Sequence, residues 1–71
     1  MKIIDSKSLG NVIRARRKEL HYTQQDITDN TGYSISFLSD LENGKPTAEI
    51  GRAIDVVNLL GLDIMIKERK S

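Results

Sequence analysis

The absence of cysteine from a chain of only 71 residues most limits the folds available to it. A domain of about 60 residues buries only roughly 60% of the surface that its unfolded chain exposes, so its core is thin. Without cysteine, the chain has neither disulfides nor a thiolate metal site to strengthen that core. Well-packed helices and association with a second subunit remain, and we therefore expect a single domain, residues 1–71, that forms a homodimer.

The overall composition is that of a water-soluble globular protein. Hydrophobic residues make up 38% of the chain and charged residues 30%, and no apolar run approaches the roughly 20 residues that span a bilayer. Residues 2–8 form a polar stretch instead of a secretory signal, so we expect a cytoplasmic protein with no membrane contact. The net charge is only +1, but basic side chains cluster within residues 14–18 and acidic ones lie between 26 and 42.

The chain offers little for catalysis or metal binding. His21 is its single histidine and cysteine is absent, so neither a multi-histidine metal site nor an activated thiol can form. Asp26 and Asp29 lie on a segment predicted to be a short exposed helix, where solubility explains them more simply than acid–base chemistry. We therefore expect no enzyme activity, no cofactor and no bound metal.

Apolar residues recur at helical spacing through most of the chain and predict four helices. The first covers residues 7–20. Thr23 is an N-cap candidate for a second helix that runs to about residue 31, and Ser34 is an N-cap candidate for a third helix over 35–42. The fourth helix contains the apolar residues between 50 and 60 and ends at Gly61.

The residues after the fourth helix alternate in polarity as a β-strand does. Over residues 62–69 one face carries three aliphatic side chains, Leu62, Ile64 and Ile66. A lone strand leaves its backbone donors and acceptors unpaired, so this one needs a partner. The sequence leaves two candidate partners open, which are the segment 2–4 of the same chain and the equivalent strand of a second subunit across a two-fold axis. A small mixed sheet at a dimer interface that contains both is a further alternative.

The segment 24–42 has the pattern of two short helices that cross steeply at a tight turn. Gly32 lies at the turn, where it is free to adopt a positive φ angle, and the small Thr28 lies where the helices approach each other. The second of these helices then presents one polar face outward, formed by Ile35, Ser36, Ser39, Asp40 and Asn43. This arrangement is a helix-turn-helix.

Two stretches of this sequence, Tyr-Thr-Gln-Gln-Asp-Ile at 22–27 and Phe-Leu-Ser-Asp-Leu-Glu-Asn-Gly-Lys-Pro-Thr at 37–47, carry a family resemblance. Together with a glycine eight residues beyond Gln24, they resemble the Cro/CI-like helix-turn-helix family of phage and bacterial repressors, also called the XRE family. The resemblance covers about residues 9–60, with Thr28 standing where the family usually has alanine. It implies a mainly α, lambda-repressor-like bundle of four helices. The C-terminal β-strand, expected to pair across a dimer, completes the predicted fold.

The resemblance also implies which residues contact double-stranded DNA. Gln24 and Ser34, at two helix N-termini, would bind phosphates. Arg17 would form an ion pair with Glu42 that locks the first helix to the third beside the DNA. The full predicted DNA-binding set is Arg17, Gln24, Ser34, Ile35, Ser36, Phe37, Ser39, Asp40, Asn43 and Lys45, with Asn43 and Lys45 on the backbone beyond the groove. The predicted dimer interface is Leu62, Ile64 and Ile66.

The base-reading positions lack the arginine or glutamine that makes bidentate contacts to guanine or adenine. Ile35 or Phe37 would touch a thymine methyl group, and the serines would bond to either kind of partner. Asp40 would either accept from cytosine or repel phosphates. We therefore expect weaker direct readout, with the remaining specificity coming from DNA shape.

Three functions fit this interpretation. The helix-to-strand ending resembles that of HipB-type antitoxins, which implies an autorepressor that binds an inverted-repeat operator and a HipA-like kinase toxin. A free-standing phage-type or bacterial repressor without a toxin is the second. A helix-turn-helix adaptor that binds protein instead of DNA is the third, and it predicts no salt-sensitive binding to any duplex.

Overall fold

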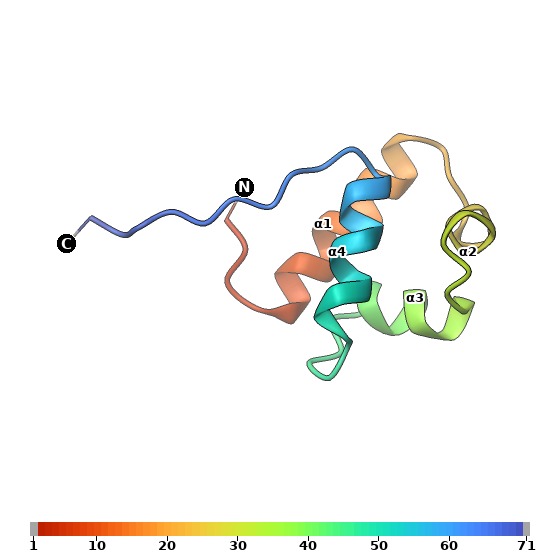
Figure 1. Cartoon of the computed structure of the whole chain (residues 1–71), viewed down its shortest axis with the longest axis horizontal. Coiled ribbons are helices and arrows are strands. Elements are labelled where there is room, and N and C mark those ends of the chain that lie inside the picture. The colour runs from red at the N-terminus through yellow and green to blue at the C-terminus, as the bar shows by residue number, and fades with distance from the viewer. Residues whose placement is uncertain (1, 71) are drawn as a thin grey trace.

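The computed structural model describes residues 2–70, and within that range the chain forms four α-helices (Figure 1). They are α1 (Ser6–Glu19), α2 (Gln24–Thr31), α3 (Ile35–Glu42) and α4 (Ile50–Leu59). The mainly helical architecture predicted from the apolar spacing is therefore present. None of the described helices is long and apolar enough to cross a membrane.

Side chains just before the helices fix where three of them begin. The Asp5 carboxylate accepts a hydrogen bond from the Ser8 amide at 2.7 Å and starts α1. The Thr23 hydroxyl accepts from the Asp26 amide at 3.1 Å and starts α2. The Ser34 hydroxyl accepts from the Phe37 amide at 3.0 Å and starts α3. Each bond satisfies an amide that has no partner within its own helix, so these local bonds define the helix boundaries.

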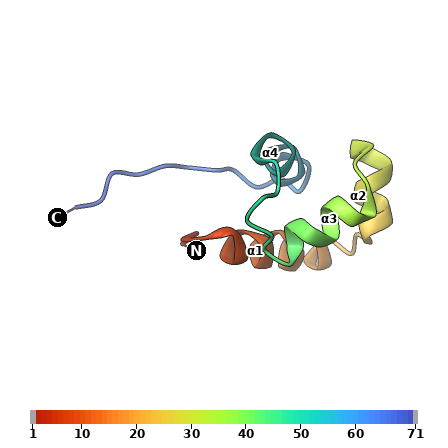
Figure 2. The ribbon, with the colours of Figure 1, turned by 90° about the horizontal axis from the view of Figure 1, so that it is seen from below.

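The turn between α2 and α3 depends on Gly32, whose φ angle is +77°. A side chain disfavours this left-handed conformation, and glycine adopts it freely. The Gly32 amide donates to the Thr28 carbonyl at 2.8 Å, which closes the end of α2. The chain then reverses within a few residues, and Figure 2 shows α2 and α3 meeting at a steep angle.

All four helices contribute to one small core. Its buried side chains are Ile13, Ile27, Leu38, Leu41, Ala53, Val56, Val57 and Leu60. Gly10 of α1 lies directly against the C-terminal end of α3. A Cβ atom there would meet the Leu41 carbonyl oxygen and would lie 2.7 Å from that of Glu42. The glycine therefore allows α1 and α3 to pack closely.

The C-terminal strand predicted over 62–69 is wrong. Residues 62–70 are extended but form no strand, and they lead away from the helices (Figures 1 and 2). Leu62 packs against the core and its amide donates to the Val57 carbonyl at 3.1 Å, whereas Ile66 is 96% exposed. In the described chain the segment 2–4 makes no backbone hydrogen bonds with these residues. A strand requires such a partner.

Candidate nucleic-acid interface

One face of α3 is buried in the core and the opposite face is open. Leu38 and Leu41 point inward with 1% and 3% of their surface exposed. The outer face consists of the residues predicted to face DNA, namely the exposed Ile35, Ser36 and Asn43 and the half-buried Ser39 and Asp40. A helix with its N-terminal end and one polar face free has the shape that enters a major groove in helix-turn-helix proteins.

The C-terminal end of α3 is fixed to α1 by Arg17 and Glu42. The Arg17 guanidinium donates through Nε to Glu42 Oε2 at 2.7 Å and through Nη2 to Oε1 at 2.9 Å. Its Nη1 donates to the Tyr22 carbonyl at 2.9 Å. Arg17 is 8% exposed and Glu42 is 4% exposed, and the hydrogen bonds and charge of Glu42 raise the pKa of Arg17 above its ordinary value. The guanidinium is therefore turned inward, where it connects α1, α3 and the loop before α2.

Gln24 at the start of α2 also contacts this ion pair. Its Nε2 donates to Glu42 Oε1 at 3.3 Å, a contact that no local sequence pattern predicts. A side-chain amide has two N–H donors, so one remains for a phosphate. The first amides of α2 carry the positive end of the helix dipole. Gln24 is therefore held in place by the same carboxylate that holds Arg17.

Ser34 is the N-cap residue of α3. Its oxygen accepts from the Phe37 amide, which leaves its own O–H free to donate. The side chain is exposed. The N-termini of α2 and α3 thus each carry a polar side chain beside the first amides of a helix.

Phe37 lies against α4 and not on the open face of α3. It is half-buried, and its ring packs edge-on against Tyr33 with centroids 5.6 Å apart. The Arg52 guanidinium of α4 lies 5.3 Å from the Tyr33 ring centre and 5.9 Å from that of Phe37. The Tyr33 hydroxyl donates to the Asp55 carboxylate, and this hydrogen bond raises the pKa of Tyr33. These contacts make Phe37 a packing residue beside the interface.

Two polar contacts cross the C-terminal end of α3. Asn43 Nδ2 donates to Ser39 Oγ at 3.4 Å. Lys45 Nζ lies 3.3 Å from Asp40 Oδ2, with roughly half of both side chains exposed. In the prediction from the sequence, Asp40 contacts bases and Lys45 contacts the DNA backbone, with no contact between the two. Their opposite charges across a short turn were the available signal that the two would meet.

The basic cluster on α1 does not form one continuous surface. Besides the buried Arg17, Arg16 donates through Nε to the Leu60 carbonyl at 3.0 Å and pairs with Glu19. Arg16 therefore supports the C-terminal end of α4. Arg14 and Lys18 are exposed.

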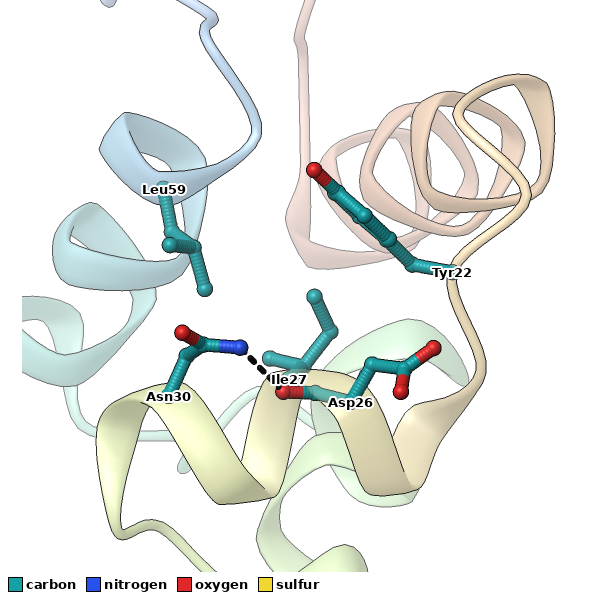
Figure 3. Close-up of a pocket in the computed structure, with 5 residues that line it drawn as sticks. All are labelled: Tyr22, Asp26, Ile27, Asn30 and Leu59. Atoms are coloured by element: carbon teal, nitrogen blue, oxygen red, sulfur yellow. Dashed lines mark hydrogen bonds between the residues drawn. The ribbon is translucent and has the colours of Figure 1, made fainter.

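A small cavity of about 90 Å³ lies between α2 and α4 (Figure 3). Its lining consists of Tyr22, Asp26, Ile27, Asn30 and Leu59. Asn30 Nδ2 donates to the Asp26 carbonyl at 2.8 Å, so this amide continues the hydrogen bonding of α2. The cavity is lined by residues outside α3 and by none of the residues predicted to contact DNA.

Comparison with known proteins shows which family this chain belongs to. Residues 13–66 match the family HTH_3, described as helix-turn-helix. The HTH-type transcriptional regulator y4mF of Sinorhizobium fredii is 40% identical over 58 residues, which are 82% of this chain and 76% of that protein. The ImmF control region 10 kDa protein of Bacillus phage phi105 is 33% identical over 64 residues, which are 90% of this chain and 71% of that protein.

Solved structures share the fold. The HipB-O4 20mer complex contains a chain that superposes with a TM-score of 0.89 at 20% identity, covering 99% of both chains. The structure of MDT Protein gives the same score, identity and coverage. At this identity the likeness concerns the fold alone. The members of the helix-turn-helix family HTH_3 are DNA-binding transcriptional regulators and not enzymes. The family match and the two relatives show that this chain belongs to HTH_3, which is the Cro/CI-like (XRE) family that its sequence resembles.

Proposed function

We propose that this regulator is a sequence-specific repressor that binds an inverted-repeat operator and places α3 in the major groove. The observation that carries the proposal is the rigid presentation of α3. Its outer face is open, while the buried Arg17–Glu42 pair fixes its C-terminal end and Gln24 joins that pair from α2. Ile35, Ser36, Ser39 and Asp40 then read bases, because side chains positioned in this way reach base edges.

The phosphate contacts follow from the ends of the helices. Gln24 and Ser34 donate to the backbone from the N-termini of α2 and α3, where the helix dipoles favour a negative charge. Asn43 and Lys45 contact the backbone beyond the other end of α3. Arg17 acts by holding these elements in place, since its guanidinium is already bonded on α3 and on the loop.

The repressor acts as a homodimer, with Leu62, Ile64 and Ile66 at the subunit interface. Ile66 is 96% exposed and Ile64 is 49% exposed, and aliphatic side chains left open in this way favour association. Two-fold symmetry would place two copies of α3 about one helical turn apart on the DNA.

The biological role that fits best is antitoxin and autorepressor of a HipBA-like operon, acting in the cytoplasm with a HipA-like kinase toxin as its partner. The fold agrees with a HipB chain over 99% of both chains, which includes the extended C-terminal tail. A free-standing repressor is the second candidate, and the relative from the ImmF control region of a phage favours it. A protein-binding adaptor is the outcome if no duplex binds. An adjacent kinase gene whose product co-purifies with the repressor distinguishes the first candidate from the second.

The first test is selection of DNA duplexes from a random pool by the purified protein. The affinity for the most enriched duplex is then measured at several salt concentrations. The expected result is an inverted repeat whose affinity falls steeply as salt rises.

Ser36→Ala should change the preferred bases with little loss of stability, and the exposed Arg14→Ala serves as the matched control. Deletion of residues 63–71 should yield a monomer in sedimentation and much weaker operator binding. Failure to enrich any sequence would contradict the repressor proposal.

A further inference from the structure

We propose that the salt bridge between Asp40 and Lys45 breaks when Asp40 meets a cytosine and remains intact on other bases. A single base then determines both the base contact of Asp40 and the phosphate contact of Lys45. This inference rests on the proposed function, because it concerns how α3 reads DNA. In the free protein the Lys45 ammonium lies 3.3 Å from the Asp40 carboxylate. The proposed basis of selectivity for cytosine is that Asp40 exchanges Lys45 for the base while Lys45 exchanges Asp40 for a phosphate.

The backbone holds the two side chains close to each other. The Lys45 amide donates to the Asp40 carbonyl at 3.0 Å, which folds the end of α3 back so that residue 45 stays beside residue 40. The salt bridge is nevertheless weak, because 54% of the Lys45 side chain and 46% of the Asp40 side chain are exposed. Ion pairs exposed to this extent contribute little. The pair can therefore open whenever another partner is better.

Asp40 is the ionised residue on the outer face of α3, which otherwise carries Ile35, Ser36, Ser39 and Asn43. It lies one helical turn after Ser36, so the two share the middle of that face. A carboxylate that enters a groove between phosphates is repelled unless a cation or a donor compensates its charge. The protein supplies the cation, Lys45, and the correct base supplies the donor.

Base chemistry decides which base that is. Guanine and thymine present acceptors in the major groove, and adenine places an acceptor beside its amino donor. Cytosine presents an amino donor, which is the group that aspartate recognises. On cytosine, Asp40 accepts from the base and releases Lys45 to the nearest phosphate. On guanine or thymine, Asp40 keeps Lys45, and the phosphate contact is not made.

The exchange has a signature in salt dependence that simple base reading lacks. Each phosphate neutralised on duplex DNA adds about 0.9 to the slope of log affinity against log salt concentration. A cytosine-containing operator should therefore show a slope steeper by about 0.9 than the same operator with guanine or thymine at that position. Its affinity should be higher by on the order of tenfold to a hundredfold, as for a mismatch at one base pair.

The experiment compares wild type, Asp40→Asn and Lys45→Ala in duplex selection and in affinity measurements across salt. Wild type should select cytosine at one position of each half-site, and Asp40→Asn should select adenine there, because asparagine pairs bidentately with adenine. Lys45→Ala should abolish the slope difference between operators. Lys18→Ala, which removes an exposed lysine of α1, should leave that difference intact.

The outcomes separate the two proposals. If wild type selects an inverted repeat but Asp40→Asn selects the same bases at every position, the exchange is refuted while the repressor function stands. Equal salt slopes on matched and mismatched operators would also refute it. If wild type enriches no sequence, the repressor proposal fails and the exchange fails with it. Circular dichroism melting of each variant shows whether a change in binding reflects a change in folding.

Discussion

Replacing Arg17 with alanine should be among the most damaging single changes outside the hydrophobic core. The guanidinium is 8% exposed and donates to both oxygens of Glu42 and to the Tyr22 carbonyl. Removing it leaves the carboxylate of Glu42 buried with a single long hydrogen bond from Gln24, at 3.3 Å. Removing one partner of a buried ion pair typically costs about 3–5 kcal/mol.

We therefore expect Arg17→Ala to lower the free energy of unfolding at pH 7 by about 3–4 kcal/mol, in the lower part of that range, because Gln24 still donates to Glu42. A domain of this length has a total stability of roughly 4–11 kcal/mol. The melting temperature at pH 7 should fall by about 12–30 °C.

Urea unfolding at pH 7, followed by circular dichroism, measures this loss. Arg14→Ala, an exposed change on the same helix, should alter stability by less than about 0.5 kcal/mol. The double variant Arg17→Met with Glu42→Leu should recover much of the loss, because it removes both buried charges. A loss below about 1 kcal/mol for Arg17→Ala would show that the pair behaves as an exposed one.

Three further changes test other contacts. Thr28→Ala should raise the free energy of unfolding by about 1 kcal/mol in thermal melts. Within residues 2–70 the buried Thr28 hydroxyl makes no hydrogen bond, and alanine is the better helix former. A lower stability of the variant would show that packing of the threonine methyl group outweighs these two gains. Gly10→Ala should lower stability by about 1–3 kcal/mol, since its Cβ would overlap carbonyl oxygens of α3, and an unchanged melting temperature would mean that the helices shift freely. In a Tyr22→Phe background, Tyr33 should titrate above the ordinary tyrosine pKa in ultraviolet absorbance, because it donates to Asp55. A raised Tyr33 pKa in the folded state stabilises the protein below pH 10, and this contribution is lost as the pH rises through that raised pKa. Asp55→Asn should lower the Tyr33 pKa, and an unchanged pKa would argue against this hydrogen bond.

Much of the candidate site follows from local patterns in the sequence. The outer face of α3 was predicted from helical spacing, and its limits from Ser34 and the residues after Glu42. The particular roles of Gln24 and Lys45 came from the family resemblance. Side-chain partners were harder to predict, because Lys45 reaches Asp40 only through the fold of the turn. Likewise, the bond from Gln24 to Glu42 joins two helices whose relative placement no local pattern specifies.

The sequence by itself determined that there are four helices and, to within a residue, where three of them begin, because N-caps, the positive φ of Gly32 and apolar spacing act over a few residues. Only the tertiary structure decided what these elements do to one another. It placed Gly10 against carbonyl oxygens of α3, buried Arg17 with Glu42, and left Ile66 exposed on a tail without a strand partner. The physical reason is range: a cap is satisfied within one turn of helix, whereas a strand, an ion pair or a close packing contact needs a second segment that distant parts of the chain bring into place.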